Sequence, residues 1–311
     1  MQKSRSILVT GGAGFIGSNL IELLVKDSNN RVYSLDDYST GSPHNHIEGA
    51  EYRRGHTGDR RVLKGLTEVK PALVFHLGEY SRVEQSFADV AQVWRGNLTG
   101  TPAVLEFCRT VGAKLVYAGS STKFCDGGVG RNQSPYAWSK ASNADLVNNY
   151  GAWYCLKYAI AYFYNVYGPR EIAVGNYATL IGRFKTCRRA GLPLRVVRPG
   201  TQVRNFTHVD DIVRGLALVG ECGSGDDYAL GADEGYSILE VARMFGGAIE
   251  WLPERAGNRQ TSLLVSSRAR DELGWRPERK LTDHIRDFLV GLQKPLEPCG
   301  IPVVGSVASG C

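Results

Sequence analysis

A glycine-rich turn near the N-terminus constrains this chain more than any other feature. Residues 10–17 read TGGAGFIG, with three glycines at the spacing GxxGxxG. An apolar run over residues 6–10 predicts a buried strand before the turn, and the periodicity of residues 15–26 predicts a helix after it. Such glycines allow a tight turn, close approach of the backbone to a pyrophosphate, and close helix–strand packing. The glycines are Gly11, Gly14 and Gly17.

An acidic pair follows the next predicted strand. Residues 31–35 are apolar enough for a buried strand, and Asp36 and Asp37 come directly after them. A carboxylate about 20 residues beyond the turn accepts hydrogen bonds from adenosine ribose hydroxyls and repels a 2′-phosphate. Strand, turn, helix and acid together therefore predict NAD as the cofactor. The alternative is an ordinary glycine turn beside two solvated aspartates.

The spacing of apolar runs predicts the fold class. Buried strands are expected at residues 72–75 and 114–118, with one long helical stretch over 83–111. Continuous apolar strands separated by helices are typical of a parallel sheet covered on both faces. We therefore expect an α/β fold, a Rossmann-type doubly wound parallel sheet with a smaller C-terminal α/β lobe.

The pattern changes after residue 168, where shorter helices and strands mix. Helices are expected at 177–190, 210–219 and 238–245, and strands at 194–197 and 248–252. We expect an NAD-binding domain over 1–168, with 205–232 returning to it. A mainly substrate-binding lobe over 169–292 and a Gly/Pro/Val/Ser-rich tail over 293–311 complete the expected division.

Composition excludes several classes of function. The net charge of +6 comes without a basic run, so we expect no nucleic-acid partner. The seven cysteines are scattered, which predicts neither disulfides nor a metal site. No apolar run approaches the ~18 residues of a membrane span, and no signal segment is visible. The expectation is a soluble, cytoplasmic protein without a membrane partner.

A tyrosine and a lysine stand four residues apart in the middle of the chain. Pro135 favours a helix start, and Tyr136 and Lys140 would then share one helix face. A neighbouring ammonium group stabilises a phenolate, which makes this tyrosine a candidate base. Ser120 and Ser121 follow a predicted strand, where a hydroxyl could bond the substrate oxygen that loses its proton.

These motifs together resemble a known family. With residues 163–170 (FYNVYGPR) and 204–211 (RNFTHVDD), they are similar to the extended short-chain dehydrogenases/reductases that are NAD-dependent nucleotide-sugar epimerases and dehydratases, in particular UDP-hexose 4-epimerases. The resemblance runs from about residue 7 to residue 289. It implies a nucleotide-sugar substrate and a homodimer formed through helices near 91–111 and 136–154.

The resemblance also implies residue roles. Tyr136 would be the catalytic base, Lys140 would hold the nicotinamide ribose, and Ser120 would donate the hydroxyl, with Ser121 as a close alternative. Arg204 and Arg255 would clamp the diphosphate. The implied cofactor-binding residues are Gly11, Gly14, Phe15, Ile16, Gly17, Asp36, Asp37, Thr40, Leu77, Gly78, Asn97, Tyr136 and Lys140. The implied substrate-binding residues are Arg82, Ser120, Asn165, Asn176, Arg204, Arg255 and Ser262.

The residues after Ser120 favour one reaction of the family. Dehydratases and decarboxylases of this family carry a carboxylate there, whereas this chain has Ser121 and Thr122. We therefore expect 4-epimerisation through a transient 4-keto sugar. A 4,6-dehydratase, a 4-dehydrogenase and a non-enzymatic NAD-binding sensor are the alternatives. In the epimerases that this chain resembles, a small residue at the position of Ser262 implies room for an N-acetyl group.

Three charged residues depart from the family pattern. Glu79 and Arg82 interrupt a loop that is usually made of small residues. Arg82 could meet an acidic sugar such as a uronic acid, but we expect it to pair with Glu79. Lys123 would place an unusual positive charge near the pocket.

Overall fold

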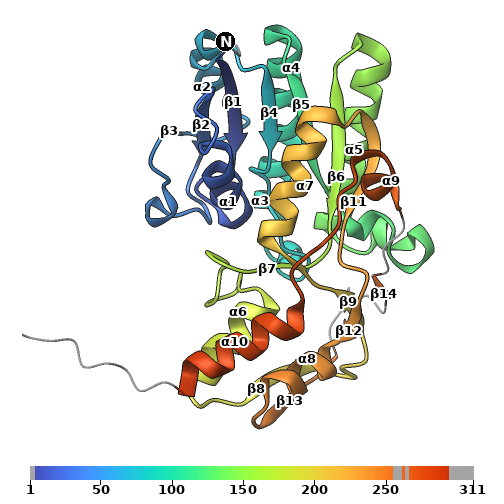
Figure 1. Cartoon of the computed structure of the whole chain (residues 1–311). Helices are drawn as coiled ribbons and strands as arrows, with labels where there is room; N and C mark the ends of the chain where they lie inside the picture. Colours follow the sequence, from blue (N-terminus) through green and yellow to red (C-terminus); the bar gives the residue numbers. More distant parts are fainter. Residues whose placement is uncertain (1–3, 255–260, 263–265, 294–311) are drawn as a thin grey trace, which may run out of the picture.

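The computed structural model describes residues 4–254, 261–262 and 266–293. Its body is a seven-stranded sheet with the order β11-β6-β5-β4-β1-β2-β3, in which all neighbours run parallel (Figure 1). The expected doubly wound α/β fold is confirmed. The strands are β1 (Arg5–Thr10), β2 (Asn30–Asp36), β3 (Ala50–Arg54), β4 (Leu73–His76), β5 (Lys114–Ser120), β6 (Tyr158–Phe163) and β11 (Gly225–Leu230).

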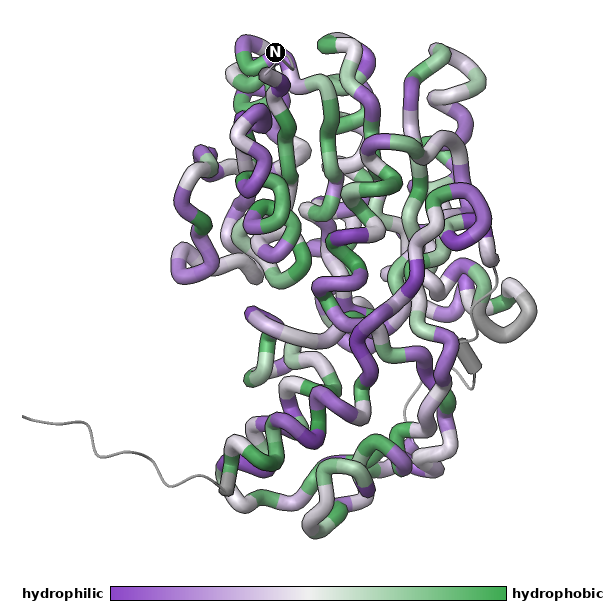
Figure 2. Tube along the Cα trace, in the orientation of Figure 1, coloured by the Kyte–Doolittle hydropathy of each residue, from purple (hydrophilic) through white to green (hydrophobic). Residues whose placement is uncertain are grey.

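Both faces of this sheet are buried because its strands are apolar on both sides. Ile7 and Val9 pack into the core cluster that contains α1 (Phe15–Leu24) and α7 (Val209–Cys222). Leu8 points to the opposite face, whose cluster contains α4 (Gly100–Val111) and α5 (Pro135–Tyr154). Figure 2 shows the hydrophobic colour along the central strands. Burial of this apolar surface stabilises the three layers.

The helical stretch predicted over residues 83–111 is present from Val90 to Val111, but it is not one regular α-helix. The segment is divided into η3 (Gln85–Phe87), α3 (Val90–Val93), a π-helical stretch η4 (Trp94–Thr99) and α4. A Cβ at Gly100 would lie only 2.4 Å from the hydroxyl oxygen of Thr57, so the start of α4 packs closely against that residue. Periodicity could not reveal the π-helical stretch, because the apolar spacing hardly changes across it. The strands β3, β6 and β11 were also not predicted from the sequence.

A second, smaller group of elements lies beyond the carboxyl ends of the strands (Figure 1). Its core includes the buried Phe184, Phe245 and Ile285, from three different helices. The predicted strands at 194–197 and 248–252 are present and pair in parallel. The elements are α6 (Leu180–Arg189), α8 (Ile238–Phe245), α10 (Leu281–Gln293), β8 (Leu194–Val197), β9 (Val203–Asn205), β12 (Gly235–Ser237), β13 (Ile249–Leu252) and β14 (Thr261–Ser262).

After α6, β8 and β9 of this lobe, the chain returns to the main sheet. α7 packs against α1, and β11 extends the main sheet beside β6. These contacts favour the proposed division, in which residues 205–232 belong with 1–168 and not with 169–292.

Among the residues that the structure describes, no helix is long and apolar enough to cross a membrane. The remaining elements are α2 (Arg60–Gly65), α9 (Arg268–Leu273), β7 (Val166–Tyr167), β10 (Thr207–His208), η1 (Pro43–Asn45), η2 (Thr67–Val69), η5 (Ser121–Lys123) and η6 (Cys125–Asn132).

Candidate active site

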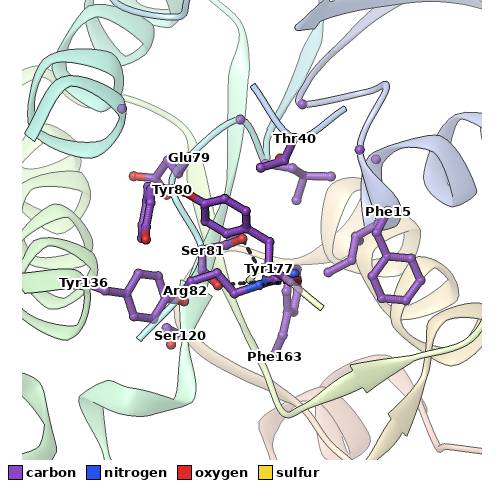
Figure 3. A pocket seen from close by; sticks show the side chains of 18 of the residues that line it. Phe15, Thr40, Glu79, Tyr80, Ser81, Arg82, Ser120, Tyr136, Phe163 and Tyr177 are labelled. Atoms are coloured by element: carbon purple, nitrogen blue, oxygen red, sulfur yellow. Dashed lines mark hydrogen bonds between the residues drawn. The ribbon is translucent and has the colours of Figure 1, made fainter. Parts of the chain in front are cut away.

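A pocket of about 550 Å³ lies at the carboxyl ends of the parallel strands. Its walls come from the turn after β1, the ends of β2, β4 and β5, the start of α5, and residues 163–181. The chain order reverses between β1 and β4, and such switch points are where open α/β sheets bind their ligands. Figure 3 places Tyr136 and Ser120 toward one end and Phe15 and Thr40 toward the other.

The glycine turn can exist only without side chains at two positions. Gly11 has φ +72°, and a Cβ there would lie 2.9 Å from Gly78. A Cβ on Gly17 would lie 2.1 Å from the carbonyl oxygen of Gly11. The turn therefore packs its own backbone at the start of α1, and the first residues of this helix line the pocket. The free N–H groups at a helix N-terminus stabilise an anionic group.

Asp36 is held at the end of β2 by backbone amides. Its Oδ2 accepts from Ala13 N at 2.9 Å, and its Oδ1 accepts from Tyr38 N at 2.8 Å. Burial raises the pKa of Asp36, while these two hydrogen bonds oppose that shift. Each carboxylate oxygen keeps acceptor capacity for a ligand hydroxyl.

Most of the expected cofactor residues line this one pocket. The cradle left by the absent side chains, the helix N-terminus and the fixed carboxylate suit a dinucleotide diphosphate with a free ribose hydroxyl. The residues fit NAD in that sense. The expected residues found in the lining are Gly11, Gly14, Phe15, Ile16, Gly17, Asp36, Asp37, Thr40, Leu77, Gly78, Tyr136 and Lys140.

Asn97 is the exception, because it lies behind the pocket wall. It is fully buried, accepts from Tyr80 N at 2.7 Å and donates to the hydroxyl of Ser139 at 2.9 Å. Its neighbours Arg95 and Gly96 line the pocket instead. The π-helical turn places this side chain inward, where it fixes the loop after β4.

The candidate catalytic groups converge from β5 and α5. Ser134 caps α5 by accepting from Ala137 N at 3.1 Å, and Pro135 occupies the first turn, as predicted. Tyr136 and Lys140 therefore lie one turn apart on the face toward the pocket. Ser120 ends β5 in the same lining, where its oxygen accepts from the hydroxyl of Thr122 at 3.0 Å. Ser121 lines the pocket beside it.

The predicted pairing of Glu79 with Arg82 was wrong. Glu79 forms a buried ion pair with Lys140, and Asn143 donates to its other oxygen at 2.8 Å. Burial by itself raises the pKa of Glu79, but the charge of Lys140 and the hydrogen bonds that the carboxylate accepts together outweigh it, and the net shift is downward. The lysine lies on a neighbouring helix, so sequence separation concealed this partner.

Arg82 turns the other way, into the pocket. Its Nε donates to the carbonyl oxygen of Tyr177 at 2.7 Å, and Nη1 donates to that of Ser81 at 3.0 Å (Figure 3). Burial lowers the pKa of the Arg82 guanidinium. The side chain lines the pocket near Tyr136 and Ser120, so a polar or acidic ligand group there would meet a cation.

Lys123 does not reach the pocket, contrary to expectation. Its Nζ donates to the hydroxyl of Tyr162 at 3.1 Å and to Asp226 at 3.3 Å. Asp226 comes from β11, so the return of that strand to the sheet gives the charge a partner away from the ligand. The unusual lysine thus joins η5 to β6 and β11.

Only some of the expected substrate-binding residues line the pocket. Asn165 lines the pocket and donates to Asn205 O at 3.0 Å, whereas Asn176 is exposed and lies outside the lining. Arg204 is buried in β9, away from the lining, and its Nη1 donates to Val203 O at 2.8 Å. Ser262 lies opposite Arg204 in β14. The side chain of Ser262 and all of Arg255 lie outside the described residues.

Two tyrosines of the pocket were not predicted from the sequence. The hydroxyls of Tyr80 and Tyr177 both donate to Asp89, at 2.9 and 2.6 Å, and their rings meet edge to face. The position of Tyr80 beside Glu79, in a loop with an unusual sequence, could have indicated a role in the pocket. Nothing in the sequence indicated such a role for Tyr177, which lies in a segment without a motif, 88 residues from its partner Asp89.

Comparison with known proteins agrees with this geometry. The NAD dependent epimerase/dehydratase family matches residues 7–231. The UDP-glucose 4-epimerase of Mycolicibacterium smegmatis is 30% identical over 89% of this chain and 95% of its own. The dTDP-glucose 4,6-dehydratase of Streptomyces griseus is 30% identical over 94% and 98%.

A solved structure agrees in fold and names the cofactor. The Thermus thermophilus UDP-glucose 4-epimerase, in complex with NAD, superposes with a TM-score of 0.84 at 28% identity, covering 94% of this chain and 100% of that one. Similar proteins thus include both epimerases and dehydratases. Fold, pocket and matched residues establish that this chain belongs to the NAD dependent epimerase/dehydratase family, with NAD as its cofactor.

Proposed function

We propose that this enzyme is a 4-epimerase of a nucleotide-linked hexose, most simply a UDP-sugar. The observation that carries the proposal is the character of the groups beside Tyr136. β5 ends in Ser120, Ser121 and Thr122, all of which line the pocket and bear hydroxyls only. Water elimination needs a further acid and base at the sugar, whereas epimerisation at C4 needs one base and a reversible hydride acceptor.

The carboxylates of the pocket support this choice. Among the described lining residues they are Asp36, Asp37 and Glu79. The first two lie at the end of β2, at the adenosine end of the proposed cofactor site. The third is buried and paired with Lys140. No carboxylate of this described lining is therefore left for the elimination chemistry of a dehydratase.

Each of the groups in the pocket has a separate role in the proposed reaction. Bound NAD supplies the hydride acceptor and donor. Tyr136 takes the proton of the sugar O4 hydroxyl and returns it after the 4-keto sugar has turned over. Ser120 donates a hydrogen bond to the same oxygen, and Lys140 favours the phenolate through its charge.

The sugar itself is constrained by Arg82. Its guanidinium lies among Tyr80, Tyr177 and Tyr136, so a sugar that carries a carboxylate would gain a charge-assisted hydrogen bond there. We propose that the enzyme accepts uronic acid derivatives as well as neutral hexoses. The small Ser262 favours N-acetylhexosamines on sequence grounds. Both substrates belong in the first assay.

A homodimer is the proposed assembly. Several large apolar side chains are exposed on η3, α3, η4 and α5, and the rings of Trp94 and Trp138 meet edge to face. Such clusters mark protein interfaces. Trp138→Arg is expected to give monomers by light scattering, whereas the exposed Trp251→Arg, in β13, should leave the mass unchanged. The exposed residues are Phe87, Val90, Trp94, Trp138, Trp153 and Tyr154.

The reaction is tested by product analysis in deuterated water. The protein, supplied with NAD, is incubated with UDP-, dTDP- and GDP-hexoses, UDP-N-acetylglucosamine and UDP-glucuronate, and the products are followed by NMR. Inversion at C4 without deuterium at C5 is expected. Deuterium at C5 with loss of water would establish the dehydratase, and accumulation of a keto sugar with reduced cofactor would establish the dehydrogenase.

A further inference from the structure

A continuous path of buried hydrogen bonds joins the glycine turn to the candidate catalytic lysine. The hydroxyl of Thr10, at the end of β1, lies 2.7 Å from His76 Nδ1, and His76 Nε2 lies 3.0 Å from the hydroxyl of Thr101. Thr101 donates to Glu79 Oε1 at 2.6 Å, and Glu79 Oε2 pairs with Lys140. All five side chains are buried. Four elements contribute to one polar path beneath the pocket.

The donors along this path can be assigned from one end. The amides of Leu77 and Gly78 donate to the Thr10 oxygen at 3.2 and 3.0 Å, which occupies both of its acceptor sites and leaves the Thr10 proton for His76 Nδ1. His76 then carries its proton on Nε2 and donates to Thr101, whose own proton goes to Glu79. Burial lowers the pKa of His76 to about 4, in keeping with a neutral ring. The path therefore ends at the carboxylate of Glu79, which accepts the last hydrogen bond of the path.

The other contacts of Glu79 and Lys140 complete the arrangement. Tyr117 donates to Glu79 Oε1 at 3.2 Å, and Asn143 donates to the same oxygen. The Lys140 ammonium also donates to the carbonyl oxygen of Ala118. An ammonium has three N–H donors, so two are engaged by the protein and one remains for a ligand.

We propose that Glu79 is a positioning residue that fixes the ammonium of Lys140 beside Tyr136 and offsets part of its charge. The inference rests on the roles proposed above for the tyrosine and the lysine. The attraction within a buried ion pair offsets the desolvation of its charges only when the remaining lone pairs of the carboxylate also accept hydrogen bonds. Here the carboxylate of Glu79 accepts from three further donors. A glutamate is thus held where this loop usually carries small residues.

The carboxylate of Glu79 is the acid that balances the charge of Lys140. Among the described residues, the other titratable groups that face this ion pair are the neutral His76 of β4 and Tyr117 of β5. Removing the charge of Glu79 leaves a buried ammonium without its partner, so Lys140 should no longer be held in place beside Tyr136.

The test is the affinity of the protein for NAD, measured by fluorescence titration. Lys140 is the proposed ligand of the nicotinamide ribose, so we expect the dissociation constant of NAD to rise about tenfold in Glu79→Gln. Glu48→Gln, which removes an exposed carboxylate, should leave it unchanged. An unchanged dissociation constant in a folded Glu79→Gln protein would overturn the proposal, since a merely structural role would lower only thermal stability.

A second variant covers a failure of Glu79→Gln to fold. Glu79→Asp keeps the charge but shortens the reach by one methylene, so the affinity for NAD should fall less than in Glu79→Gln, while kcat falls and KM is retained. A wild-type kcat in Glu79→Asp would refute the positioning role. The titration needs no sugar substrate, so a failed epimerase assay and a failed Glu79 proposal give different results.

Discussion

The two ends of the pocket are built in different ways. At the cofactor end, the turn between β1 and α1 packs glycine against glycine, and Asp36 is fixed by amides of the adjacent turns. At the sugar end, Arg82 is held by the carbonyl of Tyr177, which is 95 residues away in the sequence. A local backbone motif can thus determine a dinucleotide site, whereas the sugar site depends on how distant segments meet.

Tyr136 lies toward the sugar end of the pocket, and its removal should have the largest effect. In Tyr136→Phe we expect kcat to fall about 10³-fold, because the proton acceptor is lost. The dissociation constants of NAD and of the nucleotide sugar should hardly change. Tyr154→Phe, an exposed tyrosine of the same helix, should keep full activity. A large loss of NAD affinity in Tyr136→Phe would mean that the two ends do not bind independently.

The buried path beneath the cofactor end predicts a dependence of stability on pH. His76 has its pKa lowered by burial from 6.5 to about 4, so the unfolded chain takes up the proton at higher pH than the folded one. Stability contributed by the neutral ring is then present above about pH 6.5 and lost as the pH falls toward 4, by about 3 kcal/mol.

The measurement is the free energy of unfolding by urea across this range. His76→Asn should be less stable near neutrality, but its stability should fall less steeply toward acid. The exposed His44→Asn should follow the wild-type curve. Parallel curves for wild type and His76→Asn would contradict a neutral buried ring.

The glycine turn should show how strictly backbone geometry controls the cofactor end. Gly17→Ala places a methyl group against the Gly11 carbonyl, so the turn must open and lose charge-assisted bonds to the diphosphate. We expect NAD affinity to fall about 100-fold, measured by fluorescence titration. Gly65→Ala, where a Cβ meets nothing within 4 Å, is the matched control. Undiminished NAD affinity in Gly17→Ala would remove the distinction between the two ends.

Arg82 should give the smallest effect, confined to the sugar end. In Arg82→Met we expect KM for UDP-glucuronate to rise about tenfold relative to KM for UDP-glucose, because a charge-assisted hydrogen bond is lost. NAD affinity should stay at the wild-type value, as it should in the exposed Arg53→Met control. An equal change for both sugars would leave Arg82 without a role in recognising a carboxylate.

Local patterns predicted most of the body and of the cofactor end. The strand before Gly11, the helix after Gly14, the acid at Asp36 and the helix start at Pro135 all lie within a few residues of the signal that marks them. The π-helical stretch before Gly100 was missed, because the apolar spacing hardly changes across it. Arg204 and Asn176 were placed by resemblance alone, and neither lines the pocket.

What the sequence alone determined is the chemistry that short-range geometry enforces: a dinucleotide turn, an acid after the next strand, and a tyrosine and a lysine one helical turn apart. Only the tertiary structure decided the partners of the charges. Glu79 meets Lys140 and not Arg82, and Lys123 meets Asp226 away from the pocket. Ion pairs form between groups that packing brings together, and the order of residues along the chain does not contain that information.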